Sequence, residues 1–340
     1  MQKLKTLLQD FSHRKIFWPL VAIAVVLLIN LIITPSFFRI EIKNGHLFGS
    51  LIDILNRATP LIIMAIGMTL VIATGGIDIS VGSIVAISGA IAATLIQTMP
   101  VPLAIVITLI AAIICGMWNG MLVSGIGIQP MIATLILMTV GRGVAQLITN
   151  GQIITINNNV YSFIGTGYLL GLPFAVFIAA AVILVIFFLT RKTAMGLFIE
   201  SVGGNSISSK YAGIKAKRII FQVYVICGIC TGIAGLIISS NIKSADANNA
   251  GLWMELDAIL ATVIGGTSMS GGRFYIGGTV AGALFIQSLT TTIYSLGVPP
   301  ETILVVKAVV IILVCLSQSN EFRSLLSGIA NQRQKKVIKA

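Results

Sequence analysis

The residues of this chain that could do chemistry are a few acids, amides and hydroxyls that interrupt long apolar stretches. Asp78 and Ser80 lie in a glycine-rich turn, residues 75–82, between two apolar runs. An ionisable side chain at membrane depth is costly unless it is paired or hydrated, so by default it indicates a functional site. Asp78 or Ser80 is also suited to capping the helix that follows, whose first N–H groups need acceptors. We therefore predict a helix cap at this turn, and with it a gate in a translocation path.

Two further polar residues belong to the same hypothesis. Gln129 precedes an apolar stretch at 130–148 and Thr134 lies in its first turns. Both are polar at a helix end or at membrane depth. We place them, with Asp78 and Ser80, near the path or its gate.

Arg142 lies deeper in the stretch 130–148, where a lone arginine costs about 2.5–3.5 kcal/mol on insertion scales. It can snorkel to the interface, or it can find a partner at the outer mouth of a path. The loop after a later apolar stretch carries three acids, Asp246, Glu255 and Asp257. These acids are predicted to form that mouth or to contact a soluble partner.

Membrane-spanning helices must position these residues. Of the 340 residues, 56% are hydrophobic and 9% are charged, whereas a soluble chain carries about a quarter charged residues. About 20 apolar residues cross a bilayer core, so we predict an all-α polytopic membrane protein with nine clear spans and a weaker one at Leu256–Thr267. The clear spans are Trp18–Ile33, Leu51–Ala73, Ser80–Gln97, Val101–Val123, Pro130–Ile148, Pro173–Thr190, Ile219–Ser240, Ile276–Leu296 and Ile303–Leu316.

The net charge of +12 does not indicate nucleic-acid binding, because the basic residues cluster in three segments. These are the N-terminal segment 1–17, the central loop 191–218 and the C-terminal tail 319–340. Basic clusters mark cytoplasmic segments. Six spans separate the first two clusters, and a cytoplasmic tail requires the weak span to cross as well. We therefore predict one transmembrane domain over 1–340, with ten helices and both termini in the cytoplasm.

The central loop contains a short polar helix. Gly203, Gly204 and Asn205 are predicted to open it and Gly213 to close it. It is too polar to span a membrane. It is either a solvated surface helix or a docking element for a cytoplasmic partner.

Glycines suggest a tightly packed bundle. Gly228/Gly232 and Gly278/Gly282 have the small-xxx-small spacing that lets membrane helices approach closely. Residues 75–82 and 265–272 also share the pattern GG-xxx-S-x-G, which resembles the paired glycine breaks of a transporter repeat. Coincidence in a glycine-rich chain explains the match equally, and the topology above puts both stretches on one side, unlike an inverted repeat.

Several chemistries have no supporting pattern. The chain has no G-x-x-x-x-G-K-[ST] phosphate loop and only two histidines. Cys227-x-x-Cys230 has no second cysteine pair beside it, so small buried side chains explain it better than a metal. No span has the several acids expected of an ion-coupled carrier. We predict no enzymatic activity, no metal and no cofactor.

Taken together, these residues resemble the permease subunits of bacterial ABC sugar importers of the ribose/galactose type. The resemblance covers about residues 48–316. It rests on five ordered motifs: Thr74–Gly82, Gln129–Leu135, Arg142-Gly143, Gly203–Ile214, and Glu255–Ile259 running into Val263–Ser268. It implies the helical fold of the vitamin-B12-importer type (type II) in a bacterial inner membrane.

Within the family, three stretches are most similar to galactofuranose-importing members: Leu47–Arg57, Gly141–Ile148 and Ala245–Trp253. The resemblance implies a sugar substrate, a periplasmic sugar-binding protein, a cytoplasmic ATP-binding subunit and a second permease that is a different chain. The ATP-binding subunit would dock on the helix between Gly203 and Ile214. Ser208 and Ser209 depart from the family there, because they stand where small alanines are usual.

Three alternatives stay open. The chain could import ribose or a furanosyl signalling molecule, be an ion-coupled secondary sugar carrier, or be a membrane scaffold that transports nothing. Glycine-broken spans argue against the scaffold. Dependence on an ATPase separates the importer from the carrier.

Overall fold

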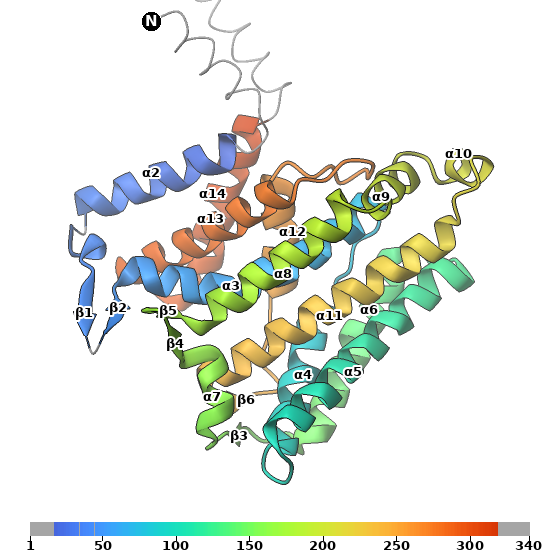
Figure 1. Ribbon diagram of the computed structural model, residues 1–340. Coiled ribbons are helices and arrows are strands. Elements are labelled where there is room, and N and C mark those ends of the chain that lie inside the picture. The colour runs from blue at the N-terminus through green and yellow to red at the C-terminus, as the bar shows by residue number, and fades with distance from the viewer. Residues whose placement is uncertain (1–16, 34, 44, 319–340) are drawn as a thin grey trace, which may run out of the picture.

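The computed structural model describes residues 17–33, 35–43 and 45–318, and within them the chain is mainly helical (Figure 1). The predicted cytoplasmic tail, residues 319–340, and all but the last residue of the predicted N-terminal segment, residues 1–17, lie outside the described residues. The α-helices are α2 (Phe17–Ile33), α3 (Ser50–Ala73), α4 (Val81–Leu95), α5 (Val101–Gly120), α6 (Pro130–Thr149), α7 (Asn159–Thr166), α8 (Phe174–Arg191), α9 (Met195–Gly204), α10 (Ser206–Tyr211), α11 (Ala216–Ile242), α12 (Met254–Ile264), α13 (Ile276–Ser295) and α14 (Pro300–Gln318).

Short antiparallel strand pairs mark one end of the bundle, which we call the strand end. They are β1 (Glu41–Lys43) with β2 (His46–Phe48), β3 (Ile154–Thr155) with β6 (Ser244–Ala245), and β4 (Tyr168–Leu169) with β5 (Leu172–Pro173). The helices α9 and α10 lie at the opposite end, the α9–α10 end (Figure 1). The β3–β6 pair joins the loop after α6 to the loop after α11, so both loops belong to the same end, as the predicted topology requires.

Each predicted span corresponds to a helix. Among the described residues, six helices are long and apolar enough to cross a membrane: α3, α6, α8, α11, α13, and α5 with the π-helical turn that extends it, Met121–Ile126. Shorter apolar helices cover Phe17–Ile33, Val81–Leu95 and Thr302–Val314. The weak tenth span is α12, whose 11 residues rise only about 16 Å.

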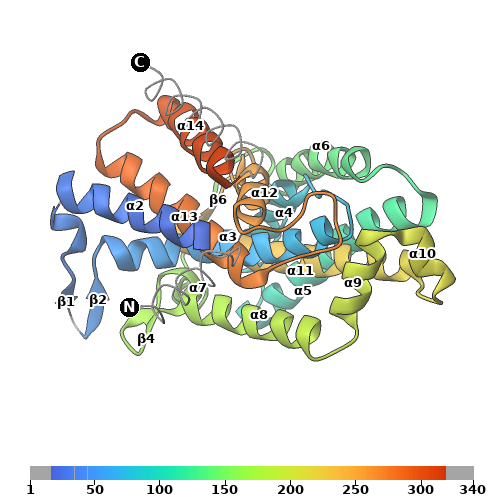
Figure 2. The ribbon, with the colours of Figure 1, turned by 90° about the horizontal axis from the view of Figure 1, so that it is seen from above.

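The helix α3 forms the centre of the bundle. Within the most apolar 18-residue stretch of α3, 83% of the residues are buried inside the protein. It packs against α11, α13, α12 and α8, as the view from above shows (Figure 2). In the corresponding stretches of α5, α6 and α8, only 28%, 28% and 22% of the residues are buried. These three helices therefore present apolar faces to lipid or to a second membrane subunit.

The predicted close approach of helices at glycines is confirmed. On α11, Gly228 and Gly232 lie against Ala112 of α5, where an added Cβ atom would stand 2.6 Å from the Ala112 carbonyl oxygen. On α13, Gly278 and Gly282 lie against Gly265 and the backbone of α12. Both contacts leave no room for a side chain.

Two short helices, α4 and α12, each follow a non-helical segment, and the two helices run in opposite directions. α4 follows a non-helical segment, residues 74–80, at the α9–α10 end and runs to the strand end. α12 follows a non-helical segment, residues 246–253, after β6 and runs the other way, to the glycines that follow it. The stretch that corresponds to residues 74–80 is therefore 246–253. The matching glycine pattern at 265–272 is not its counterpart, since both patterns lie at the same end in contact with each other.

Candidate functional site

Asp78 organises the segment that precedes α4. It is fully buried, and its Oδ1 atom accepts hydrogen bonds from the backbone N–H of Ser80 at 3.0 Å and from the Ser80 hydroxyl at 2.6 Å. Asn119, near the end of α5, donates to Ser80 Oγ at 2.7 Å and to Asp78 Oδ1 at 3.4 Å. The predicted helix cap is wrong in its detail. Ser80 stands at the N-cap without a side-chain bond to the helix, because Asp78 holds its hydroxyl.

Thr134 of α6 holds the same segment from another side. Its hydroxyl accepts a hydrogen bond from the backbone N–H of Ile79 at 3.2 Å and donates within α6 to the carbonyl of Pro130 at 2.9 Å. The structure thus brings Asp78, Ser80 and Thr134 together. Gln129 is not part of this cluster, since it is exposed at the N-cap of α6.

The segment before α12 is held by Arg142 of α6. Arg142 Nη1 donates to the carbonyl oxygens of Ala250 at 2.6 Å, Ala247 at 3.3 Å and Asn248 at 3.4 Å. One turn further along α6, Gln146 donates to Asn248 Oδ1 at 2.6 Å. Arg142 therefore binds mainly to backbone carbonyls of the predicted mouth rather than pairing directly with one of its acids.

Asp246 closes the turn that begins this segment. Its carboxylate accepts the side-chain N–H of Asn249 at 2.7 Å and the backbone N–H groups of Asn248 and Asn249 at 2.9 and 3.2 Å. The Asn249 side chain, these backbone donors and the nearby Arg142 charge hold the pKa of Asp246 below its usual value.

The start of α12 packs on the first turn of α4. A side chain at Gly82 would overlap the Glu255 carboxylate and approach the carbonyl oxygen of Gly251 to 2.5 Å. Glu255 itself is buried, at 2% exposure. The beginnings of the two short helices therefore meet inside the protein, and Gly82 permits that contact.

Asp257 does not join the other acids of the predicted mouth. It forms an ion pair with Lys307 of α14, with Nζ 2.9 Å from Oδ2 and 3.1 Å from Oδ1. Sequence reasoning missed Lys307 and Asn119, although each is the one charged or amide residue of its predicted span, which was the available signal.

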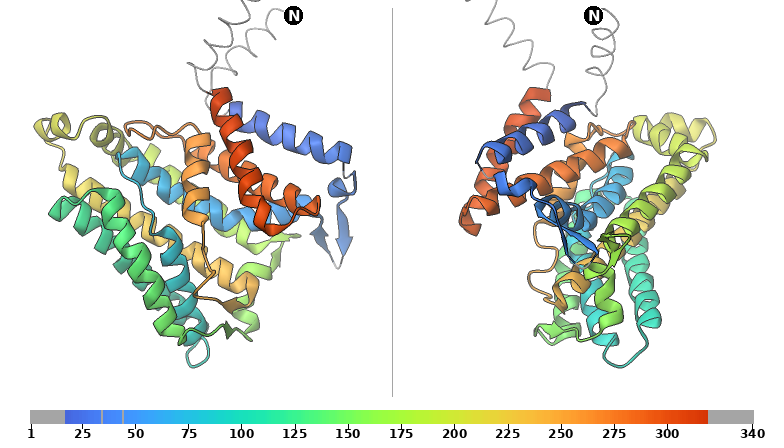
Figure 3. Two further views of the ribbon diagram at one scale, coloured as in Figure 1. Left: turned by 180° about the vertical axis from the view of Figure 1, so that it is seen from behind. Right: turned by 60° about the vertical axis from the view of Figure 1, so that its left-hand side comes forward.

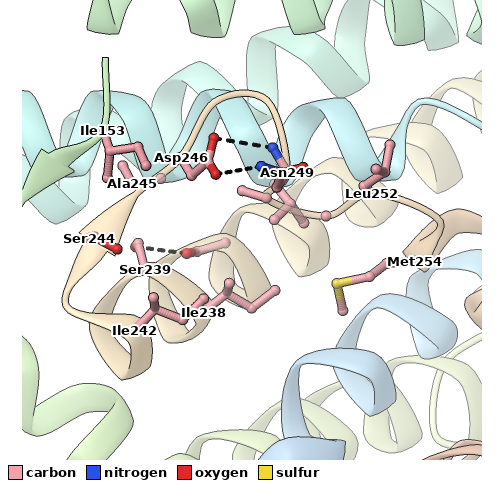
Figure 4. A pocket seen from close by; sticks show the side chains of 15 residues that line it. Ile153, Ile238, Ser239, Ile242, Ser244, Ala245, Asp246, Asn249, Leu252 and Met254 are labelled. Atoms are coloured by element: carbon pink, nitrogen blue, oxygen red, sulfur yellow. Dashed lines mark hydrogen bonds between the residues drawn. The ribbon is translucent and has the colours of Figure 1, made fainter. Parts of the chain in front are cut away.

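A cavity of about 490 Å³ lies between the 246–253 segment and the helices α4 and α11. Figure 4 shows Asp246 and Asn249 on one side of it and Ser239, Ile238 and Ile242 of α11 on the other. Most of its lining is apolar, and its polar side chains are Asp246 and Asn249 of the segment, Ser239 of α11 and Ser244 of β6. The cavity is large enough for a small molecule, or for movement of the segment.

The α9–α10 end carries an exposed helix. Asn205 caps α10 by accepting the backbone N–H of Ser208 at 2.9 Å, and Gly213 ends the turn with a φ of +84°, as predicted. Ser209 is buried and bonds Ser201 of α9 at 2.8 Å, so this departure from alanine ties the two helices together. α9 itself was not predicted, and Gly203 and Gly204, which were predicted to open the short helix, are instead the last residues of α9.

Two apolar side chains of α10 face solvent in this structure, Ile207 at 68% exposure and Tyr211 at 89%. A groove lies on each side of the helix. Ile207, Lys210 and Tyr211 help to line one groove, and Ile214 and Arg218 help to line the other. Exposed apolar side chains bordered by basic residues are typical of a protein-binding surface.

Three glycine pairs meet behind this helix, in what we call the glycine junction: Gly75-Gly76, Gly203-Gly204 and Gly271-Gly272. The N–H of Gly272 donates to the carbonyl of Ala73, the last residue of α3, at 2.9 Å. A Cβ atom at Gly203 would overlap that carbonyl, and one at Gly271 would stand 2.7 Å from the Gly203 carbonyl oxygen. The backbone of α9 therefore directly touches the end of α3, which leads into the segment before α4, and the loop after α12.

Membrane helices interrupted by non-helical segments, together with an exposed helix at one end of the bundle, are features of a polytopic membrane permease. Residues 50–315 match the family of branched-chain amino acid transport system permease components, and the chain belongs to that family. It is 50% identical over 325 residues to the galactofuranose transporter permease YtfT of Escherichia coli K12, covering 94% of this chain and 95% of that one.

Other relatives are named for other sugars. The fructose import permease FruF of Bifidobacterium longum is 40% identical over 95% of this chain and 92% of its own. The ribose import permease RbsC of E. coli K12 is 38% identical over 87% of this chain and 91% of its own. No solved structure matches the chain.

Proposed function

We propose that this chain is a permease subunit of an ABC sugar importer in a bacterial inner membrane, and that its sugar is galactofuranose. The relatives named for sugar import support the class, and the 50% identity to a galactofuranose permease supports the sugar. The observation that carries the proposal is the glycine junction. It connects an exposed helix suited to a protein partner with both broken crossings of the bundle.

The ends of the bundle have different partners in this proposal. The α9–α10 end faces the cytoplasm, where an ATP-binding subunit docks on α10 and Ile214. The strand end faces the periplasm, where a sugar-binding protein delivers its ligand near Arg142 and the 246–253 segment. Both termini are then cytoplasmic, with ten crossings that include α12.

The sugar path lies outside the single chain. Asp78, Ser80 and Thr134 are fully buried within it, so they position the segment before α4 and take part in gating without lining the path. α6 instead presents the polar side chains of Thr139, Arg142 and Gln146 along one face. A polar stripe on a membrane helix is unfavourable against lipid, so this face lines a path shared with a second permease chain.

Transport follows from movement of α9 and α10. When the ATP-binding subunits close, α10 is displaced and Gly203 presses on Ala73 and Gly272. The displacement reaches α4 through residues 74–80 and reaches α12 through the loop after it. Because the beginnings of α4 and α12 touch at Gly82 and Glu255, the two segments move together and change access from one end of the bundle to the other.

Cellular uptake tests the sugar. The chain would be expressed with its neighbouring subunits in a bacterium that lacks its own galactofuranose, ribose and fructose permeases, and uptake of each labelled sugar measured. Galactofuranose uptake that ribose and fructose do not compete with supports the proposal. Uptake of ribose or fructose alone keeps the importer and contradicts the sugar, and uptake that persists without the ATP-binding subunit favours a secondary carrier.

A further inference from the structure

Lys307 is a buried cation in the middle of an apolar ridge. The helix α14 packs on the bundle through Ile303, Lys307 and Ile311, which are 5%, 9% and 4% exposed and share one face. A methionine or leucine at 307 would complete that ridge. A lysine at membrane depth is unfavourable unless it is compensated, so packing alone does not account for it.

The compensation comes from the first turn of α12. Lys307 Nζ lies 2.9 Å from Asp257 Oδ2, and the two side chains are only 11% and 23% exposed. Asp257 stands two residues after Glu255, which packs on α4. The ion pair therefore fixes α14 to the part of α12 that touches α4, and not to its far end.

A second cation holds the same stretch from α6. Arg142 binds the carbonyls of Ala247 and Ala250, while Lys307 binds the Asp257 carboxylate. Residues 246–257 thus run between cations from two helices, and Figure 3 shows α12 between α14 and the α4–α6 side of the bundle. The segment also borders the cavity of about 490 Å³, which lies between it and the helices α4 and α11 and gives it room to move in that direction.

We propose that Lys307 is a positioning residue for transport, whose ion pair with Asp257 keeps α12 and the 246–253 segment in the place from which the glycine junction can move them. This inference rests on the proposed function. With the pair intact, displacement at Gly272 is passed through α12 to the segment. Without it, the start of α12 shifts toward the cavity, and ATP is hydrolysed without a matching movement of sugar.

The test uses the complete importer in proteoliposomes and compares sugar imported per ATP hydrolysed. In K307M, which keeps the apolar ridge, this ratio is expected to fall about tenfold, the effect of roughly 1.4 kcal/mol on an equilibrium. The double variant D257K/K307D restores the pair and is expected to recover the ratio to within about fivefold, since a lysine near a helix N-terminus costs up to about 1 kcal/mol.

A matched control breaks an exposed ion pair. Arg39 and Glu41 are 3.1 Å apart with side chains 76% and 37% exposed, and R39M is expected to leave the ratio unchanged. Wild-type coupling in K307M would overturn the proposal. If K307M does not assemble with its partners, the double variant D257K/K307D provides the test. A double variant that assembles but keeps a low ratio of sugar imported to ATP hydrolysed also overturns the proposal.

A second readout needs no sugar. Gln146 and Asn248 are hydrogen bonded at 2.6 Å, so the cysteine pair Q146C/N248C reports the position of the segment through its rate of cross-linking by a short bifunctional thiol reagent. The rate is expected to fall in K307M and to recover in D257K/K307D. If the wild-type importer moves no galactofuranose while K307M still slows cross-linking, the proposed sugar fails and the positioning role stands. An unchanged rate in K307M contradicts that role.

Discussion

Gly203, near the C-terminal end of α9, lies directly against the carbonyl oxygen of Ala73, the last residue of α3. The same carbonyl accepts the backbone N–H of Gly272. A contact of this kind is stiff, because backbone atoms touch without a flexible side chain between them. It is therefore suited to passing a displacement of α9 to the core of the bundle.

A methyl group at Gly203 should disrupt this contact. In G203A the added Cβ would overlap the Ala73 carbonyl, and overpacking of this kind typically costs about 1–3 kcal/mol. We expect a lower melting temperature and loss of sugar uptake. The control is G125A, where the added atom meets only Met121 Cγ at 3.7 Å, and unchanged behaviour of both variants would contradict the stiff contact.

Removal of the Asp78 carboxylate should destabilise the segment before α4. In D78A the Ser80 N–H and hydroxyl lose their shared acceptor in a fully buried position, which costs about 1–3 kcal/mol. Thermal unfolding of the purified permease measures the loss. D53A serves as control because Asp53 is exposed at the start of α3. Equal melting temperatures of D78A and D53A would show that the carboxylate has no structural role.

The exposed side chains of α10 should be needed for the ATP-binding subunit and not for folding. Ile207 and Tyr211 are 68% and 89% exposed, so I207D/Y211D is expected to keep the melting temperature and to lose co-purification of that subunit. L170D places a charge on an equally exposed apolar residue at the strand end, where Leu170 is 88% exposed. It should retain the subunit, and retention by both variants would contradict docking on α10.

The turn at Asp246 should loosen in acid. Its pKa is lowered in the folded protein, chiefly by Asn249, so its contribution is present above the unfolded pKa and is lost as the pH falls through the lower folded value. We expect the melting temperature of the permease to fall as the pH falls below about 4. In D246N the fall should be smaller, because the amide does not titrate, and an equal fall in both proteins would assign the pH dependence to another group.

Much of the architecture could be predicted from the sequence. The length of each apolar stretch indicated the helices, and each of the ten predicted spans corresponds to one, including the short α12. The even number of crossings that the basic loops indicate stays a prediction. The paired glycines Gly228/Gly232 and Gly278/Gly282 also predicted close helix contacts that the structure confirms. These features depend on local composition, which a single sequence displays.

The partners of the polar residues could not be predicted in the same way. Arg142 bonds to backbone carbonyls about a hundred residues away, and Asp257 pairs with Lys307, 50 residues further along the chain. Such pairings depend on how helices pack, and the periodicity of one helix does not encode that packing. The same limit explains why the sequence alone could not interpret the glycine match between residues 75–82 and 265–272, because similar glycine patterns arise both in repeats and in loops that touch.

ATP-dependent uptake of labelled galactofuranose into proteoliposomes tests the central claim most directly. The liposomes would contain this chain, the neighbouring ATP-binding subunit and a second candidate permease, with the sugar-binding protein outside and either ATP or a non-hydrolysable analogue at the cytoplasmic face. We predict uptake with ATP, none with the analogue, and none when this chain is omitted. Uptake that is the same with ATP, with the analogue and without the ATP-binding subunit would contradict the importer.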